Sequence, residues 1–384
     1  MSDSSPLPVL IVGAGLSGLA CAVTLHEAGI PVQLFEASDG VGGRVRTDRV
    51  DGFLLDRGFQ VYLSAYPEAG KLLDLEALNL RAFEPGALVF DGSNIHRVMD
   101  VFRRPTAMIE SALAPVGTFM DKARVALLRF RSLGSSETEI AARPDQQTKS
   151  FLQNFGFSEN MIEGFFSAFY GGIFLERDLR TSSRMFEFTF KMFSHGSATL
   201  PATGMGAIPL QLAKRLPPET IRIRSAIASA TPNALSLPSG EEILGCQVVI
   251  ATQAPQTARL VPGFAAKEPA WRSVTNVYFQ TEKSPLNEAI IALNTSGEGL
   301  VNNVCVISDV APDYAPKGRS LISVSLLGIH KNSDIPNAVK EELYSWFGEQ
   351  TRDWKHLRTD LIKHALPEQG PGLKSPGHLS LIHI

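Results

Sequence analysis

The 384-residue chain is long enough to bury a large core, and this length favours two domains or one large domain with an inserted part. Its 36 basic and 39 acidic residues are scattered along the sequence, so no basic face for nucleic acid is indicated and a small-molecule partner is favoured. Cys21, Cys246 and Cys305 have no paired spacing, which argues against a disulfide framework or a metal site. They are expected to be three core thiols in a reducing, cytoplasmic compartment.

Residues 6–25 are almost entirely apolar, as in a signal peptide or a membrane span. However, no positive charge precedes them, three glycines interrupt them, and Glu27 follows soon after. A spanning helix needs about 20 uninterrupted apolar residues. We therefore expect a buried strand that turns into a helix, with no signal peptide and no transmembrane helix.

The first motif is a glycine-rich turn between a strand and a helix. Four β-favouring residues, 9–12, are followed by Gly13, Ala14, Gly15 and, three positions later, Gly18. In this spacing the first glycine permits a tight turn, the second lets backbone approach a pyrophosphate, and the third lets helix and strand pack closely. A second predicted strand ends at Glu36, from which a carboxylate can accept hydrogen bonds from an adenosine ribose. The order of these elements favours a dinucleotide site over a βαβ unit without a ligand.

The segment "FEASDGVGGRVRT", residues 35–47, bears on which dinucleotide is bound. A carboxylate at the ribose would repel the 2′-phosphate of NADP, so NADP is disfavoured. A nicotinamide cofactor needs only the βαβ unit, whereas here Gly42 and Gly43 let backbone lie against a ligand. Arg44 adds a planar, permanently charged group suited to phosphate.

At this point the sequence resembles the superfamily of flavin-dependent amine oxidases, protoporphyrinogen oxidases and phytoene desaturases. Gly42, Gly43, Arg44 and Thr47 match its G-G-R-x-x-T element, which lies along FAD. The segment "GFLLDRGFQVY", residues 52–62, resembles the next family segment, and the resemblance implies that Asp56 and Gly58 approach the flavin.

Later segments extend the resemblance. Residues 200–216 resemble the family's return to the flavin domain, and residues 247–252 resemble a strand under the nucleotide. Residues 221–230 are expected to form a strand, and the resemblance implies that the backbone of Ile227 contacts the adenine. Ordinary strand packing predicts the same residue type there.

The expected fold class is α/β, with a Rossmann-type FAD-binding domain and an inserted α+β substrate domain. The FAD-binding domain is assigned to residues 1–83, 200–265 and 345–384, and the substrate domain to 84–199 and 266–344. We expect a helix over 67–83, an exposed loop at about 134–147, a helix over 335–350, and substrate-domain strands near 273–280, 303–308 and 321–329.

Half of the phenylalanines are concentrated in one part of the chain: residues 151–193 hold 11 of 22. An aromatic-rich helical core explains most of them. The exception is the segment around two adjacent glycines, where backbone can approach a ligand or a second helix. The candidate substrate residues there are Phe169, Tyr170, Gly171, Gly172 and Phe174. Peripheral membrane contact is also compatible with this composition.

The chain departs from the family at its end, since no Gly-Asp pair and closing helix follow His364. We expect the flavin domain to lack its closing strand and helix, as in a fragment. One of the codon choices that encode Leu379 to Ile384 spells a transposon-end sequencing adapter, so these residues are hypothesised not to be biological.

The residues and the resemblance together favour an FAD-dependent oxidoreductase that moves hydride, or its equivalent, from a largely apolar substrate to flavin. A polyene or isoprenoid, a porphyrinogen and an amine stay open as substrates, with an amine least favoured. The electron acceptor is open between O2 and a quinone, and no catalytic residue is assigned. The alternatives are an NAD-linked dehydrogenase and a non-catalytic flavin-binding assembly protein.

Overall fold

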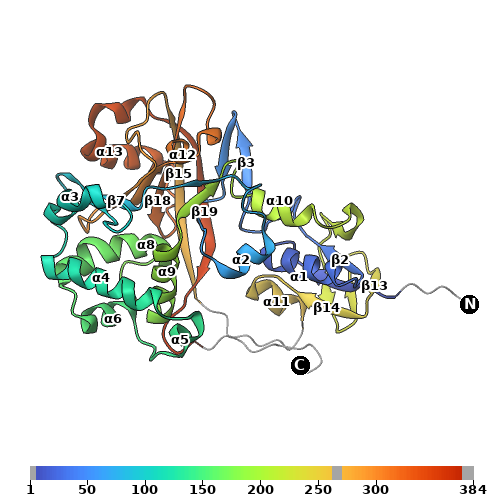
Figure 1. The fold of residues 1–384 in the computed structure, drawn as a ribbon. Helices are drawn as coiled ribbons and strands as arrows, with labels where there is room; N and C mark the ends of the chain where they lie inside the picture. The colour runs from blue at the N-terminus through green and yellow to red at the C-terminus, as the bar shows by residue number, and fades with distance from the viewer. Residues whose placement is uncertain (1–5, 262–269, 374–384) are drawn as a thin grey trace, which may run out of the picture.

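The computed structural model describes residues 6–261 and 270–373, and the suggested adapter-derived residues 379–384 lie outside them. Its ribbon forms two lobes, with the N-terminal strand and helix in one and a large sheet in the other (Figure 1). The first lobe is built on a parallel sheet in the order β10-β2-β1-β14. Its strands are β1 (Val9–Val12), β2 (Val32–Phe35), β10 (Ile221–Arg222) and β14 (Gln247–Ile250).

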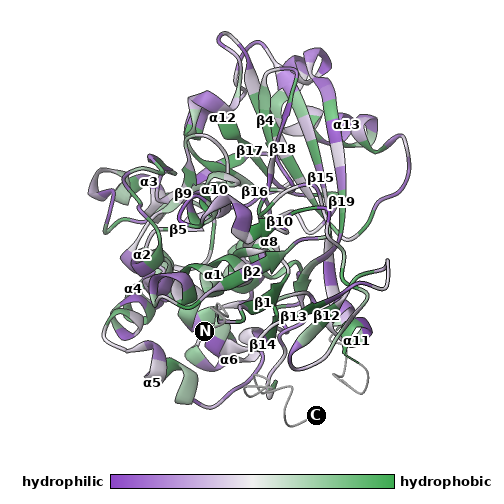
Figure 2. Cartoon of the chain, turned by 90° about the vertical axis from the view of Figure 1, so that its right-hand side faces the viewer, coloured by the Kyte–Doolittle hydropathy of each residue, from purple (hydrophilic) through white to green (hydrophobic). Residues whose placement is uncertain are grey.

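Strand β1 is buried on both faces, as its apolar sequence predicts, and Figure 2 shows this part of the lobe as hydrophobic. Val9 and Ile11 pack with α1 (Leu16–Glu27) and α10 (Ala207–Ala213). Leu10 and Val12 pack on the opposite side, since successive strand residues point to opposite faces. That side is covered by β11 (Ser229–Ala230), β12 (Ala234–Ser236), β13 (Glu242–Leu244) and α11 (Ala254–Leu260).

The second lobe contains a seven-stranded sheet in the order β19-β15-β18-β17-β16-β7-β8. Its strands are β7 (Gly86–Phe90), β8 (Ile95–Met99), β15 (Trp271–Thr281), β16 (Ile291–Asn294), β17 (Val301–Val306), β18 (Ser320–Leu327) and β19 (Lys355–Pro367). Helix α13 (Ile335–Phe347) packs on it through Val339, Leu343 and Trp346. The predicted strands β15, β17 and β18 and the predicted helix α13 are thus confirmed.

A helical layer completes this lobe and holds the aromatic core that the sequence predicts. Its helices are α3 (Met108–Leu113), α4 (Phe119–Leu133), α5 (Glu137–Ala142), α6 (Thr148–Phe155), α7 (Glu159–Met161), the π-helical segment η2 (Ile162–Phe166), α8 (Ser167–Phe174) and α9 (Ser183–His195). Within the described residues, no helix is long and apolar enough to cross a membrane.

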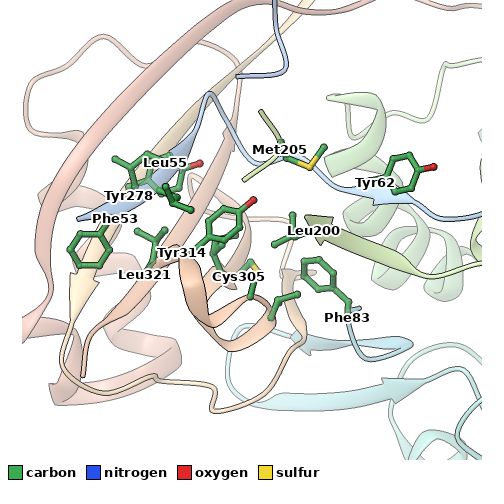
Figure 3. Packing of buried hydrophobic residues seen from close by; sticks show 14 of the residues in the cluster. Phe53, Leu55, Tyr62, Phe83, Leu200, Met205, Tyr278, Cys305, Tyr314 and Leu321 are labelled. Carbon is green, nitrogen blue, oxygen red and sulfur yellow. The ribbon is translucent and has the colours of Figure 1, made fainter. Parts of the chain in front are cut away.

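Small elements and a shared core join the lobes. The small elements are β3 (Thr47–Val50), β4 (Phe53–Asp56), β5 (Tyr62–Leu63), α2 (Pro67–Leu72), β6 (Leu80–Ala82), β9 (Ala198–Pro201) and α12 (Ile307–Val310). Short 3-10 turns lie at Pro105–Ala107, Pro218–Thr220, Pro312–Tyr314 and Gly348–Asp353. Figure 3 shows side chains of this core, from Phe53 and Tyr278 at one end to Tyr62 at the other.

Four local expectations are corrected. The helix expected over 67–83 ends at Leu72 and is followed by an Asp74 turn, whose carboxylate accepts the N–H of Ala77, and by β6. The expected loop contains α5, because Ser136 and Glu139 form a capping box at its start. The strand expected over 221–230 stops at Arg222, since Arg224 has a φ of 53°.

The fourth correction concerns surface exposure: Cys246 is exposed and is not a core thiol, whereas Cys305 is buried.

One further finding concerns the C-terminal segment. Strand β19 pairs antiparallel with β15 along most of its length, so its backbone hydrogen bonds are made in the large sheet. The domain boundaries given above otherwise stay a prediction.

Candidate active site: a nucleotide cradle beside an apolar cavity

The glycine-rich turn has the geometry that each predicted glycine requires. Gly13 has a φ of 102°, and a Cβ there would lie 2.8 Å from the carbonyl oxygen of Ala251. A Cβ on Gly18 would lie 1.9 Å from the carbonyl oxygen of Gly13, so α1 packs on the turn as only glycine allows. A Cβ on Gly15 would have no neighbour within 4 Å. The backbone of Gly15 is therefore open to a ligand.

The N-terminus of α1 is suited to an anion. Within this fully described helix, no side chain caps the first turn and no acidic residue lies there. The first N–H groups of a helix lack partners in the helix and carry a partial positive charge. The pyrophosphate of a dinucleotide fits this position.

Glu36 follows the last residue of β2 and reaches back to the glycine-rich turn. One carboxylate oxygen accepts the N–H of Ala14 at 2.8 Å, and the other accepts the N–H of Ser38 at 2.8 Å. Each oxygen keeps a lone pair for a further donor. The carboxylate is thus fixed beside the turn, where it can accept ribose hydroxyls.

The Gly42–Gly43 pair closes against this turn. Gly42 and Gly43 have φ values of 114° and 59°, which glycine adopts readily. The N–H of Gly42 donates to the carbonyl oxygen of Ala14 at 2.8 Å, and a Cβ on Gly43 would lie 3.2 Å from the Cα of Gly15. The second glycine motif therefore extends the nucleotide cradle of the first.

Arg44 points from this segment toward the large sheet. Its guanidinium donates to the carbonyl oxygen of Ala365 in β19 at 2.6 Å, and its own carbonyl oxygen accepts the side-chain N–H of Gln60 at 3.0 Å. The guanidinium has further donors, so contact with a phosphate stays a prediction.

Asp56 is the centre of a buried polar network that the sequence did not indicate. Its carboxylate accepts the Thr47 hydroxyl, the N–H of Met205 at 3.0 Å and the Tyr314 hydroxyl at 2.8 Å. Burial raises the pKa of Asp56 to about 6, although these donors act in the opposite direction. The sequence signals for Asp56 were an acid that ends an apolar strand and the resemblance of residues 52–62 to the family, which implies that Asp56 approaches the flavin; that approach stays a prediction.

Gly58 and Ile227 are two further residues that the sequence predicted to approach the cofactor. Gly58 has a φ of 90°, and a Cβ there would lie 2.4 Å from Cδ1 of Ile362 in β19. Ile227 packs against the core around Phe35, and the N–H of nearby Ser225 donates to the carbonyl oxygen of Glu36 at 2.8 Å. The strand end that carries Glu36 thus lies beside the segment predicted to contact adenine, and that contact stays a prediction.

An apolar cavity of about 950 Å3 adjoins these segments. Leu16 and Ala20 of α1 line it on one side, with Val45 from the second glycine segment. Phe169 and Tyr170 of α8 line it on the other side. The cavity therefore extends from the nucleotide-binding helix to the phenylalanine-rich layer.

The candidate substrate residues divide into two groups. Phe169, Tyr170 and Gly172 line the cavity, whereas Gly171 and Phe174 are buried and do not line it. The glycine pair brings α8 close to β17: a Cβ on Gly172 would lie 3.0 Å from Nδ2 of Asn302. The close approach predicted for these glycines is therefore to a strand.

The fold and these residues are those of a dinucleotide-binding protein with an apolar cavity beside the nucleotide cradle. The open Gly15, the uncapped α1 and the positioned Glu36 fit the pyrophosphate and ribose of FAD. The flavin containing amine oxidoreductase family model matches residues 16–377, and the chain belongs to that family. This membership confirms the predicted FAD cofactor and the class of FAD-dependent oxidoreductase.

Individual relatives match shorter segments. The chain is 31% identical to protoporphyrinogen oxidase 2 of Arabidopsis thaliana over 164 residues, 43% of this chain and 32% of that protein. It is 44% identical to carotenoid 3,4-desaturase of Haloarcula japonica over 63 residues, 16% of this chain and 13% of that protein. These matches span about a third or less of the curated relatives.

The fold is similar over almost the whole chain to a solved oxidoreductase from Methanosarcina mazei. The TM-score is 0.74 at 16% identity, covering 98% of this chain and 92% of that one. At this identity the comparison shows the α/β fold and carries no substrate assignment.

Proposed function

We propose that the protein oxidises a large, mainly apolar substrate in the cavity and passes a hydride, or its equivalent, to FAD. The observation that carries this proposal is the course of the cavity, from α1 and Val45 to the phenylalanine-rich layer. Its volume of about 950 Å3 lies near the upper end of the range of roughly 300–1,000 Å3 for small-molecule sites.

The chain's own residues bind, orient and shield the substrate. When FAD is bound, it accepts the electrons. The aromatic walls of the cavity exclude water from the substrate, because their rings present apolar surface. Burial raises the pKa of Tyr170, so its hydroxyl stays protonated and does not act as a base.

A porphyrinogen or a polyene of isoprenoid type fits such a cavity best. Relatives named for protoporphyrinogen and carotenoid chemistry support these two classes. An amine is the less favoured substrate, because mostly apolar side chains line the cavity. O2 and a quinone are the candidate electron acceptors.

Anaerobic reduction of the bound flavin tests this proposal. The FAD-loaded protein is mixed separately with a porphyrinogen, a polyene and an amine, and flavin absorbance is followed. Bleaching by the porphyrinogen or the polyene supports the proposal. Bleaching by the amine alone contradicts the substrate class, and bleaching by none of the three supports the non-catalytic alternative.

A cavity-filling substitution tests the location. Ala69 of α2 lines the cavity, so Ala69→Trp places an indole in the space assigned to substrate. We expect KM for the apolar substrate to rise by roughly tenfold, about 1.4 kcal/mol, with unchanged flavin content. Glu68→Trp on the same helix is the control, since Glu68 is exposed and does not line the cavity. Equal KM values in the two variants would remove the substrate from this cavity.

A further inference from the structure

Asn303 of β17 is a polar residue in an apolar part of the cavity wall. It is 3% exposed and lines the cavity. Its cross-strand partner, Leu293 of β16, also lines the cavity and packs with Phe165 and Phe169. A carboxamide with unfilled hydrogen bonds is costly in such surroundings. Its presence in this wall therefore calls for a physical reason.

A β-bulge turns this carboxamide toward α8. Val301 and Asn303 pair with adjacent residues of β18, so Asn302 is an extra residue in β17. Val301 and Val304 pack on one face of the sheet, in the core under α13. Asn302 and Asn303 face the other side, where a Cβ on Gly172 would lie 3.0 Å from Nδ2 of Asn302 and 3.3 Å from Oδ1 of Asn303.

The two adjacent carboxamides leave hydrogen-bonding capacity unused. Nδ2 of Asn302 donates to Oδ1 of Asn303 at 3.1 Å. Among the described residues, Nδ2 of Asn303 has no hydrogen-bond partner, and Oδ1 of Asn303 keeps a second lone pair. A buried donor without an acceptor costs about 1–3 kcal/mol. A group in the cavity that hydrogen-bonds this carboxamide would recover that cost.

Tyr62 of β5 is the other cavity-lining residue that has, within the described chain, a buried polar side-chain atom without a partner. Its hydroxyl hydrogen can rotate to suit different partners. The carboxamide of Asn303, by contrast, is held by the hydrogen bond from Asn302 and by close packing on Gly172. Asn303 is therefore better placed to fix the orientation of a bound group.

We infer that Asn303 sets substrate specificity by hydrogen-bonding an uncharged oxygen, in a hydroxyl or carbonyl group, on an otherwise apolar polyene or other isoprenoid. This inference rests on the proposed function. An ionised carboxylate is disfavoured at this position, because Leu293 and the phenylalanines around it offer no charge to compensate its burial. A pure hydrocarbon leaves the carboxamide unmatched. The hydrogen bond also fixes which end of an elongated substrate lies beside α8.

Three polyenes with one carbon skeleton test this inference: retinol carries a hydroxyl group, axerophtene is the corresponding hydrocarbon, and retinoic acid carries a carboxylate. Each is titrated into the FAD-loaded protein from the same cyclodextrin carrier, and Kd is obtained from the polyene absorbance. The ratio of Kd for axerophtene to Kd for retinol is then compared between wild type and variants, because differences in water solubility cancel in this comparison. Asn303→Leu keeps the branched shape and removes the hydrogen bond, so the ratio should fall by about tenfold. Asn303→Ala provides the same comparison if the leucine variant does not fold.

Asn276→Leu is the matched control. Asn276 of β15 is also buried and its Nδ2 has no partner among the described residues, but it does not line the cavity. Its replacement should lower the unfolding temperature and leave the Kd ratio unchanged.

An unchanged ratio in Asn303→Leu overturns the inference and leaves the proposed function standing, provided that the polyenes bind the wild type. A lower ratio in Tyr62→Phe alone also overturns it and assigns the oxygen to Tyr62. If Asn303→Leu loses affinity for retinoic acid and not for retinol, the group at Asn303 is not an uncharged oxygen. If none of the three polyenes binds the wild type, the polyene substrate of the proposed function fails together with this inference.

Discussion

Asp56 joins three distant segments of the chain through one buried carboxyl group. Thr47 precedes it by nine residues, while Met205 and Tyr314 follow it by 149 and 258 residues. The hydroxyl of Tyr278 also donates to the backbone carbonyl of Asp56 at 2.8 Å. The donors to the carboxylate are two hydroxyl groups and a backbone N–H, which carry no charge, so ionisation of the buried acid is costly.

The raised pKa of Asp56 predicts how stability changes with pH. The pKa of Asp56 is about 6 in the folded protein against an ordinary value of 3.8 for aspartate, so between these values the folded state holds more protons than the unfolded state. The free energy of unfolding therefore contains a component that falls as pH rises from about 4 to about 6. Asp56→Asn removes this component, which is worth up to roughly 3 kcal/mol.

Denaturant unfolding of the wild type and Asp56→Asn at several pH values measures the component. The difference between the two proteins should change over this pH interval and stay constant above pH 7. Asp51→Asn is the control, because Asp51 is exposed in the same hairpin and its left-handed φ of 49° suits asparagine. A pH-independent difference between wild type and Asp56→Asn would contradict the raised pKa.

At the scale of the element, the strand–turn–helix unit of the first lobe could be predicted because its signals are local. The apolar run, three glycines and Glu36 lie within 28 residues, and the structure places them in β1, α1 and the end of β2. The glycines at 171 and 172 were predicted to allow a close approach to a ligand or a second helix, whereas the structure places them against a strand. Asn302 of β17 lies 130 residues away in sequence, and no local pattern joins it to α8.

Two glycine substitutions of opposite expected sign test the packing of α1. Gly18→Ala places a Cβ on the backbone of Gly13, so α1 must move from the turn, and we expect a loss of roughly 1–3 kcal/mol of stability. The Cβ that Gly70→Ala adds to α2 would have no neighbouring atom within 4 Å. This substitution should therefore stabilise the protein by up to about 1 kcal/mol, because alanine has the higher helix propensity. Chemical unfolding measures both. A neutral Gly18→Ala would show that the close packing of helix and turn is not required.

At the scale of the whole molecule, the contacts between lobes escape sequence reasoning. Residues 345–384, which include β19, were assigned to the FAD-binding domain, and β19 does carry the acceptor for Arg44 at Ala365. Its ladder, however, lies with β15 at the edge of the large sheet, and β16, β17, β18 and α13 separate the two strands in sequence. Apolar periodicity indicates that a segment is a strand, but it does not identify the strands that pair with it.

Arg358 of β19 is the residue through which the large sheet holds the hairpin of β3 and β4. Its guanidinium donates to the carboxylate of Asp48 at 2.9 Å and to the carbonyl oxygens of Leu55 and Asp56 at 3.2 and 3.1 Å. It also pairs with Asp360 at 2.9 Å. The hairpin connects the second glycine segment to Gly58, so Arg358 helps to position residues that are predicted to approach the flavin.

Replacing Arg358 with methionine should therefore lower both stability and flavin retention. Methionine keeps much of the apolar stem but removes the guanidinium hydrogen bonds to the hairpin carbonyls and the ion pairs with Asp48 and Asp360, and we expect a loss of about 2–4 kcal/mol. Thermal unfolding and flavin content after gel filtration measure the two effects. Arg319→Met is the control, because Arg319 is more exposed and pairs at 3.4 Å with the exposed Glu282 next to the same sheet, a pair worth at most about 1 kcal/mol. If Arg358→Met and Arg319→Met shift the unfolding temperature equally and retain equal flavin, the hairpin is held by its apolar contacts and Arg358 does not set the position of the flavin site.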